Sequence, residues 1–411
     1  MGKGVKVLQI NAVYGKKSTG VIVHDIGVML CETGNESFVA YQDSPLSAPN
    51  GYKIGNKLDW KLHALLTRLT GKQGFYSRSV TKKFLNYLET LRPDIIHLHN
   101  LHANYINLPI LLEYVKEHEI GLVLTLHDCW FFTGKCTHFA DIGCEKYKTG
   151  CVGCPKKKQE IPNLLRDNAE WVYKKKRELF SDIHKKKIIG CSKWIASLAQ
   201  ESFFDKEEVG YIYNGIDTEN FKPQDRNNIR RNLGVEEEFV ILGMANKWGL
   251  AENEDVIKGL LQHYSCKNAT FVIVGCTAYN KKRFNELALE TSAKVMLIDY
   301  IQSREKLAEY YASADVFVNL THVDTLPTVN MESICVGTPV VTYNSGGSPE
   351  LILPGCGFVV EKGEINSLIK AIEDSRNLNR TNISNIGIVS FNAQLNYKKY
   401  LEIYHSLIKN E

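Results

Sequence analysis

The chain has 411 residues, which is too long for one typical hydrophobic core, so we expect two domains of about 200 residues each. It has 44% hydrophobic and 23% charged residues and lacks repeats and low-complexity segments, which excludes disordered and solenoid classes. We expect no signal peptide and no transmembrane helix, because no run of about 18 apolar residues occurs. The odd number of cysteines, 11, argues against a disulfide framework and for a cytoplasmic location.

The net charge of +4 conceals an uneven distribution. Residues 1–210 carry 30 basic and 22 acidic side chains, whereas the remainder carries 20 and 24. The segment 156–193 alone has 12 basic and 5 acidic residues. Such a run is either a solvated helix face or a contact surface for an anionic membrane or a phosphate-bearing acceptor. Nucleic acid is not expected as a partner, because no nucleic-acid-binding motif accompanies the charge.

Strand and helix patterns alternate along the first half of the chain. A buried strand is predicted over 5–13, followed by a glycine-containing loop over 15–20 and an amphipathic helix over 21–31. Further strands are predicted at 37–41, 94–99, 122–127 and 187–191. Apolar strands that alternate with helices predict a parallel sheet covered on both faces.

The segment 211–223, YIYNGIDTENFKP, interrupts this pattern with a turn signal and a proline, and predicts a domain boundary. A second set follows, with strands at 239–244, 270–274, 295–298, 316–319 and 339–343, helices at 304–312 and 328–336, and an amphipathic helix at 392–408. We therefore expect an α/β fold of two Rossmann-like, doubly wound parallel-sheet domains that face each other across a cleft. These domains would comprise residues 1–213 and 214–390, and residues 391–411 would cross back to the first domain.

Two histidine-containing motifs end predicted strands in the first domain. HLHNLH carries His97, His99 and His102, and TLHDCW carries His127 and Asp128. A histidine is more often structural, but ligands of parallel sheets bind at the carboxyl ends of the strands. His127 is therefore the main functional candidate, and His99 and His102 are secondary candidates.

Four cysteines lie within nineteen residues after the second motif: Cys136, Cys144, Cys151 and Cys154. The Cys151-x2-Cys154 spacing is typical of a metal-binding knuckle, and four thiolates suit a tetrahedral zinc ion. His138 is a further candidate ligand. A structural zinc site, unligated cysteines and a redox role are the alternatives.

The stretch 324–350 carries the chemistry predicted for the second domain. It reads DTLPTVNMESICVGTPVVTYNSGGSPE. A short loop after Asp324 leads into a helix that starts near Thr328, and free backbone N–H groups at a helix start favour a diphosphate. Glu332, one turn into the helix, is placed to accept hydrogen bonds from two ribose hydroxyls, and Asp324 from sugar hydroxyls. The pair Gly346-Gly347 allows close approach of the backbone.

This stretch resembles the E-x7-E region of the retaining GT-B glycosyltransferases of family 4, with Asp324 in place of the first Glu. The preceding REKLAEYYASADVFVNLTHVD and the linker NGID…F are also similar to that family, and the resemblance spans essentially the whole chain. It implies the GT-B fold, a UDP- or GDP-sugar as the donor, retention of anomeric configuration and no need for a catalytic metal. It also implies that Glu332 binds the ribose, that Asp324 binds the donor sugar, and that the phosphates are bound by Thr325, Leu326, Pro327 and Thr328.

In the first domain, the resemblance places His127 beside the donor sugar. It places the loop 15–20, including Gly20, near the phosphates and the acceptor. The cysteine-containing run TGKCTHF…GCEKYKTGCVGCP resembles an insertion of capsule and colanic-acid-like members of the family.

The chain departs from the family after the strand at 239–244. Members carry an Arg or Asn and then a Lys-Gly near the diphosphate. Here MANKWGLAENEDVIKGL has Asn246 and Lys247 in place but lacks the lysine expected after Trp248. Either Lys247 or Lys258 would then supply the cation that stabilises the leaving diphosphate, or that stabilisation is weakened.

Together these inferences predict a retaining glycosyltransferase of hexosyltransferase type, acting in surface-polysaccharide assembly. Its acceptor would be a saccharide or lipid-linked saccharide at the inner face of the cell membrane. A nucleotide-sugar epimerase on the same fold is a rival that the Asp324–Glu332 motif disfavours. A donor-binding but inactive partner subunit is the second rival, and the irregular lysine region is its support.

Overall fold

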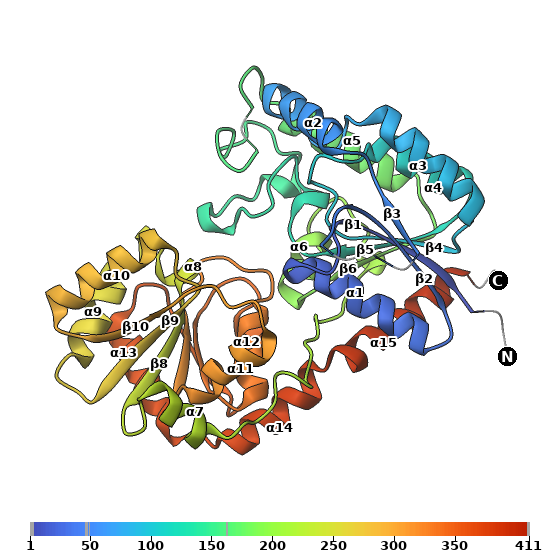
Figure 1. Ribbon diagram of the computed structural model, residues 1–411. Helices are drawn as coiled ribbons and strands as arrows, with labels where there is room; N and C mark the ends of the chain where they lie inside the picture. Colours follow the sequence, from blue (N-terminus) through green and yellow to red (C-terminus); the bar gives the residue numbers. More distant parts are fainter. Residues whose placement is uncertain (1–3, 46–47, 49, 162, 409–411) are drawn as a thin grey trace. The chain divides into compact units, whose positions relative to one another are not determined.

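The computed structural model describes residues 4–45, 48, 50–161 and 163–408. The chain divides into two compact units, residues 1–214 together with 394–411, and residues 215–393. Each unit is built on its own parallel β-sheet with helices on both faces (Figure 1). The two α/β sheets predicted from the sequence are therefore present, as expected for a chain with two Rossmann-like domains.

The sheet of the first unit has seven parallel strands in the order β3-β2-β1-β4-β5-β6-β7. Its strands are β1 (Lys6–Val13), β2 (Glu36–Asp43), β3 (Gly51–Lys53), β4 (Ile95–Leu98), β5 (Gly121–Leu126), β6 (Lys186–Gly190) and β7 (Val209–Tyr211). Its helices are α1 (Lys17–Glu32), α2 (Lys57–Thr70), α3 (Arg78–Leu91), α4 (Leu108–Glu117), α5 (Ala169–Ser181), α6 (Lys193–Gln200) and α15 (Ala393–Ile408). The strand order reverses between β1 and β4, and ligands of such sheets bind at this switch point.

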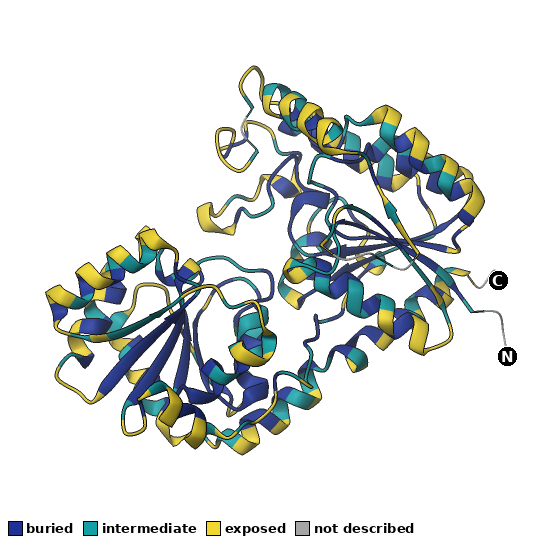
Figure 2. Cartoon of the chain, in the orientation of Figure 1, coloured by how far each residue is buried: buried dark blue, intermediate teal, exposed yellow. Residues whose placement is uncertain are grey.

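The second unit has six parallel strands in the order β10-β9-β8-β11-β12-β13, with its switch point between β8 and β11. Its strands are β8 (Phe239–Met244), β9 (Ala269–Val274), β10 (Lys294–Ile298), β11 (Val316–Asn319), β12 (Val340–Tyr343) and β13 (Gly357–Val360). Its helices are α7 (Arg226–Leu233), α8 (Ala245–Trp248), α9 (Glu254–Tyr264), α10 (Ala278–Thr291), α11 (Arg304–Ser313), α12 (Thr328–Val336), α13 (Ile365–Asp374) and α14 (Arg380–Phe391). The central strands are buried along their length (Figure 2), which explains their unbroken apolar sequence.

The last helix, α15, belongs to the first unit and is tied to its sheet by two tyrosines. The hydroxyl of Tyr404 lies 2.7 Å from Nδ1 of His97, and that of Tyr400 lies 2.7 Å from Oγ1 of Thr125. Nε2 of His97 in turn lies 2.7 Å from Oγ1 of Thr125. Because every polar atom of this buried cluster has a partner, the cluster holds α15 against β4 and β5 without an unpaired group.

One expectation from the sequence needs correction in the first unit. Helix α1 begins at Lys17 rather than at residue 21, so Gly20 lies inside the helix and not in the loop before it. The helix has no side-chain cap at Lys16, so the sequence carries no start signal there. For the basic segment 156–193, the sequence left a solvated face and a contact surface open as alternatives, and three of its 12 basic residues are buried: Lys156, Lys176 and Lys186.

The buried lysines of this segment have structural partners. Lys156 forms ion pairs with Asp141 at 2.8 Å and Glu160 at 3.1 Å, and Lys176 donates to the backbone oxygen of Thr133 at 3.1 Å. These ammonium groups therefore stabilise the loop that carries the cysteines and are not available to an external anion. Within the described residues, no helix is both long and apolar enough to cross a membrane.

Candidate functional site

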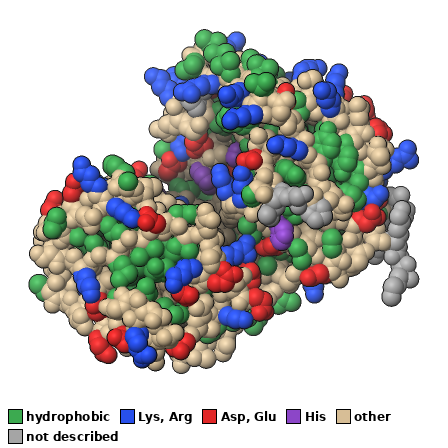
Figure 3. Space-filling model, viewed as in Figure 1, with side chains coloured by type: hydrophobic (Ala, Val, Ile, Leu, Met, Phe, Trp, Pro, Cys, Tyr) green, Lys and Arg blue, Asp and Glu red, His purple; other side chains and the backbone are tan. Residues whose placement is uncertain are grey.

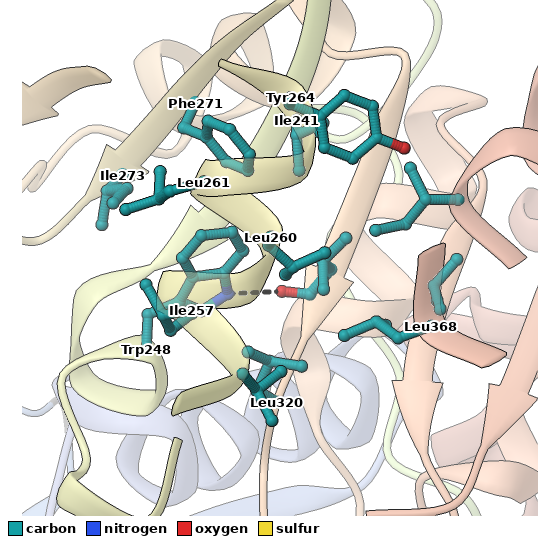
Figure 4. Close-up of a cluster of buried hydrophobic side chains, with 14 of the residues drawn as sticks. Ile241, Trp248, Ile257, Leu260, Leu261, Tyr264, Phe271, Ile273, Leu320 and Leu368 are labelled. Atoms are coloured by element: carbon teal, nitrogen blue, oxygen red, sulfur yellow. Dashed lines mark hydrogen bonds between the residues drawn. The ribbon is translucent and has the colours of Figure 1, made fainter. Parts of the chain in front are cut away.

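Helix α8 is held at the carboxyl end of β8 by the side chain of Trp248. The indole is 1% exposed, and its N–H donates to the backbone oxygen of Val318 in β11 at 2.9 Å (Figure 4). A Cβ atom on Gly243 would lie 2.3 Å from the indole, so glycine is required where β8 passes beneath it. This packing fixes the position of Lys247, the residue before Trp248.

Lys247 and Asp324 meet at the switch point of the second sheet. The Nζ atom of Lys247, after β8, lies 3.6 Å from Oδ2 of Asp324, after β11. Lys258, the other candidate cation, lies on α9 and pairs with Glu290 of α10 at 2.8 Å. Of the two lysines considered, the structure therefore places Lys247 beside the predicted sugar-binding carboxylate and directs Lys258 elsewhere. Asn246 precedes Lys247 on α8 and is exposed.

In the loop between Asp324 and α12, two backbone positions are unable to donate a hydrogen bond to an anion. Pro327 has no N–H, and the N–H of Leu326 already donates to Oδ1 of Asp324 at 3.2 Å. Helix α12 has no side-chain cap, and the N–H of Asn330 already donates to the backbone oxygen of Pro327 at 3.1 Å. The free first-turn N–H groups are therefore those of Thr328 and Val329. The hydroxyl of Thr325 is buried and has no hydrogen-bond partner among the described residues. An anion held here would therefore contact Thr325 and Thr328, whereas Leu326 and Pro327 shape the loop.

The glycine pair after β12, Gly346-Gly347, packs against the backbone of Asp324 at the start of this loop. The N–H of Gly347 donates to the backbone oxygen of Asp324 at 3.0 Å. Gly346 has a φ of +57°, and a Cβ atom there would lie 2.0 Å from the same oxygen. Only glycine satisfies both conditions, so the Gly-Gly motif fixes the backbone of Asp324.

Glu332 lies one turn into α12 and is held by the hydroxyl of Tyr311, which donates to its Oε2 at 3.0 Å. Burial raises the pKa of Glu332 to about 7, although the hydrogen bond from Tyr311 and the charge of Arg304 act in the opposite direction. The carboxyl group therefore titrates near neutral pH, which makes its function as a hydrogen-bond acceptor dependent on pH.

Asn253 and His322, which were not predicted from the sequence, connect the segments that form this site. The side-chain amide of Asn253 donates to the backbone oxygens of Lys247 and Leu320, each at 2.8 Å, and its Oδ1 lies 2.8 Å from Nε2 of His322. Asn253 thereby joins the segment after β8 to the segment after β11. An asparagine before a helix is usually read as a cap, so nothing in its sequence context indicated this connection.

In the first unit, His127 follows β5 and is part of a chain of hydrogen bonds. The amide of Gln9 donates to the backbone oxygen of Val23 at 2.9 Å, which directs its Oε1 toward Nε2 of His99 at 3.2 Å. Nδ1 of His99 lies 3.0 Å from Nε2 of His127. Burial holds the pKa of His99 well below its usual value and lowers that of His127 to about 4, so both rings are neutral at pH 7.

The orientation of the Gln9 amide determines which atom donates and which accepts in each hydrogen bond of this chain. Because Oε1 of Gln9 accepts, Nε2 of His99 donates, and the bare Nδ1 of neutral His99 accepts from Nε2 of His127. His127 then carries its proton on Nε2 and presents a bare Nδ1. It is therefore a neutral hydrogen-bond acceptor, suited to a ligand hydroxyl.

The other histidines of these motifs have different environments. His97 is fully buried against α15, so it is structural. Nε2 of His102 lies 2.8 Å from Oδ2 of Asp128. Burial alone would lower the pKa of His102, but the carboxylate of Asp128 raises it above the usual value. Gly20 packs against β1, where a Cβ atom would lie 3.1 Å from the backbone oxygen of Val13.

The four cysteines line one small cavity of about 20 Å³: Cys136, Cys144, Cys151 and Cys154. The N–H of Gly134 donates to Sγ of Cys151 at 3.2 Å, and His138 is not among the residues that line the cavity. As the side chains lie, no group of three or more His, Cys, Asp or Glu residues in the described part of the chain is arranged to hold a metal ion. The zinc site stays a prediction.

Comparisons with known proteins agree with this architecture. Residues 19–220 match the model described as Glycosyltransferase Family 4, and residues 225–384 match Glycosyl transferases group 1. The chain is 25% identical over 350 residues to a putative colanic acid biosynthesis glycosyl transferase, WcaC, of Escherichia coli, covering 82% of this chain and 80% of that protein. It is 23% identical over 226 residues to an E. coli UDP-Gal:alpha-D-GlcNAc-diphosphoundecaprenol alpha-1,3-galactosyltransferase, covering 52% of this chain and 58% of that protein.

Solved structures of similar fold include a glycosyltransferase from Rickettsia africae, with a TM-score of 0.68, 14% identity and 100% coverage of both chains. HepE of Anabaena in complex with UDP has a TM-score of 0.68 and 16% identity over 98% of this chain and 100% of that chain. Both likenesses show the fold, two Rossmann-like domains of the GT-B type.

Proposed function

The chain belongs to the GT-B glycosyltransferases, with a family 4 domain followed by a group 1 domain, and we propose that it transfers a sugar from a nucleoside-diphosphate donor with retention of anomeric configuration. It is a glycosyltransferase of polysaccharide biosynthesis. We propose a UDP- or GDP-sugar as the donor and a lipid-linked saccharide at the inner face of the membrane as the acceptor. The observation that carries the proposal is the pairing of Lys247 with Asp324 beside the uncapped start of α12.

The groups after β8 and β11 suit a sugar diphosphate. The ammonium of Lys247 and the first N–H groups of α12 supply positive charge for the leaving diphosphate, where such charge stabilises the transition state most. Asp324 then accepts hydrogen bonds from hydroxyls of the donor sugar, and Glu332 from those of the ribose. In the first unit, the bare Nδ1 that the hydrogen-bond chain leaves on His127 suits a sugar hydroxyl as its hydrogen-bond donor.

In the proposed reaction, the bond between the anomeric carbon and the diphosphate oxygen breaks. The acceptor hydroxyl oxygen forms its bond to the anomeric carbon on the face that the diphosphate leaves. The hydroxyl proton passes to the departing diphosphate, so the step requires no protein side chain as a base. The rival hypothesis of an inactive partner subunit was based on the irregular lysine region, and the 3.6 Å pairing of Lys247 with Asp324 supports an active enzyme instead.

The test is a donor-hydrolysis assay with UDP- and GDP-sugars in the absence of acceptor. A retaining enzyme is expected to release sugar slowly to water, and proton NMR of the fresh product should show the anomeric configuration of the donor. A protein that binds the nucleotide diphosphate but releases no sugar would be the inactive subunit. Release of the opposite anomer would contradict retention while leaving transferase activity intact.

Donor binding is expected to weaken as the pH falls from 8 to 6. The carboxylate of Glu332 can accept two ribose hydroxyls only when ionised, and its pKa of about 7 means that it is mostly ionised at pH 8 and mostly protonated at pH 6. The Kd of UDP or GDP in titration calorimetry should rise by up to about tenfold across this range. Glu332→Gln should bind more weakly at pH 8 and lose the pH dependence. An unchanged slope in this variant would remove the ribose assignment.

A further inference from the structure

Helix α2 exposes leucines that a helix of a globular protein normally buries. Leu58 is 75%, Leu62 59% and Leu65 55% exposed. They are spaced four and three residues apart, so they form one stripe along the helix. Figure 3 shows hydrophobic side chains beside basic ones at the top of the view, where α2 lies in Figure 1.

The opposite side of α2 is polar and buried. His63 is 1% and Thr67 4% exposed. The N–H of Gly74 donates to Nε2 of His63 at 3.3 Å, so Nδ1 carries the proton and donates to Oγ of Ser77 at 2.8 Å. Leu66 and Leu69 of the same helix are half-buried, so α2 joins the protein partly through polar groups and directs Leu58, Leu62 and Leu65 outward.

A second segment extends the apolar surface at the end of α2. Leu164 and Leu165 are 66% and 76% exposed. Their N–H groups donate to the backbone oxygens of Arg68 and Leu69 at 3.0 and 3.1 Å, so the segment lies along the last turn of the helix. Exposed leucines from two segments therefore adjoin at one place, which singly scattered surface residues do not do.

Basic residues flank these leucines without partners. Lys57, Lys61, Arg68 and Arg166 are exposed, and none forms an ion pair with a carboxylate of the described residues. Asp59, the acidic residue of the helix, accepts from the N–H of Asn56 as part of the capping box. By contrast, Lys174 and Lys175 on α5 pair with glutamates of their own helix.

We propose that this α2 surface docks on an anionic lipid bilayer, with the leucines in the interfacial region and the cations at the lipid phosphates. The α2 surface comprises Lys57, Leu58, Lys61, Leu62, Leu65, Arg68, Leu164, Leu165 and Arg166. The occupant follows from charge complementarity, because unpaired cations beside an apolar stripe suit a surface that is anionic outside and apolar within. The inference rests on the proposed function only in that a lipid-linked acceptor would give such docking a purpose.

The experiment is sedimentation of the full chain with vesicles, which requires no donor or acceptor. The protein is expected to bind vesicles of phosphatidylglycerol and phosphatidylcholine, to bind pure phosphatidylcholine weakly, and to dissociate as salt rises. Leu62→Ser/Leu65→Ser should lower the partition coefficient at least tenfold, because the inserted apolar area is lost. Lys61→Gln/Arg68→Gln should lower it about fivefold or more for each cation removed at low salt.

Matched controls lie outside the α2 surface. Leu289→Ser removes a leucine that is 83% exposed on α10, and Lys82→Gln/Lys83→Gln removes two exposed lysines from α3. Both should bind vesicles as the wild type does. Thermal unfolding checks that each variant is folded, which is expected because the substituted side chains are exposed.

Three outcomes would overturn the inference. These are no binding of anionic vesicles at low salt, equal loss in the control variants, and a change of oligomeric state in the leucine variant with vesicle binding unchanged. The last outcome would assign the surface to a second copy of the chain. Sugar release from the donor without any vesicle binding would leave the proposed function standing and remove only the docking surface.

Discussion

Replacing Lys247 by alanine is expected to lower the rate of sugar release from the donor by about a hundredfold. The ammonium lies 3.6 Å from Asp324 at the switch point of the second sheet, where the proposed reaction would develop charge on the leaving diphosphate. Removal of a preorganised positive group in such a position affects the transition state more than the ground state, so kcat should fall more than KM rises. Single-turnover hydrolysis of the donor measures this effect directly.

Lys258→Ala is the matched control for this experiment. Lys258 is half exposed and pairs with Glu290 on the surface, so its loss should leave the rate within about twofold, as for an exposed ion pair. The reverse result, a large loss in Lys258→Ala and none in Lys247→Ala, would show that the other lysine supplies the missing family cation. A similar small effect in both variants would mean that the helix start alone stabilises the diphosphate.

His127→Ala is expected to lower kcat by between about tenfold and a hundredfold, with nucleotide diphosphate binding unchanged. The neutral ring presents Nδ1 as an acceptor because His99 and Gln9 hold its proton on Nε2. If a hydrogen bond to the donor sugar strengthens as the glycosyl group departs, its loss lowers kcat but leaves the affinity for the nucleotide unchanged. Steady-state kinetics together with calorimetry of UDP or GDP separates the two quantities.

The pH profile gives an independent test of this assignment. With a pKa of about 4, lowered by burial, His127 stays neutral above pH 6, so its ionisation should not affect kcat between pH 6 and 8. His118→Ala is the control, because His118 lies on the surface, stacked on Tyr114, and its loss should change neither quantity. Near-normal turnover in His127→Ala, or an inflection near pH 6.5 that this variant abolishes, would contradict the role of a neutral acceptor.

Local patterns were sufficient for much of the second unit. The strands at 239–244 and 316–319 and the helix at 328–336 were predicted with the bounds that the structure has. These segments are short apolar runs or a helix with glycine at its end, so their conformation depends mainly on neighbours in sequence. The start of α1 was placed wrongly because Lys16 provides no cap that a sequence could reveal.

The sequence by itself determined which chemical groups the chain carries: apolar strands that pair in parallel, strand-end histidines, and an acidic pair around a helix start. Tertiary structure alone decided which of these groups meet. Whether Lys247 or Lys258 stands beside Asp324 depends on the packing of Trp248, and the proton position on His127 depends on Gln9, 118 residues earlier in the chain. The outward leucines of α2 are likewise a tertiary property, because periodicity identifies the two faces of a helix but only packing determines which face is buried.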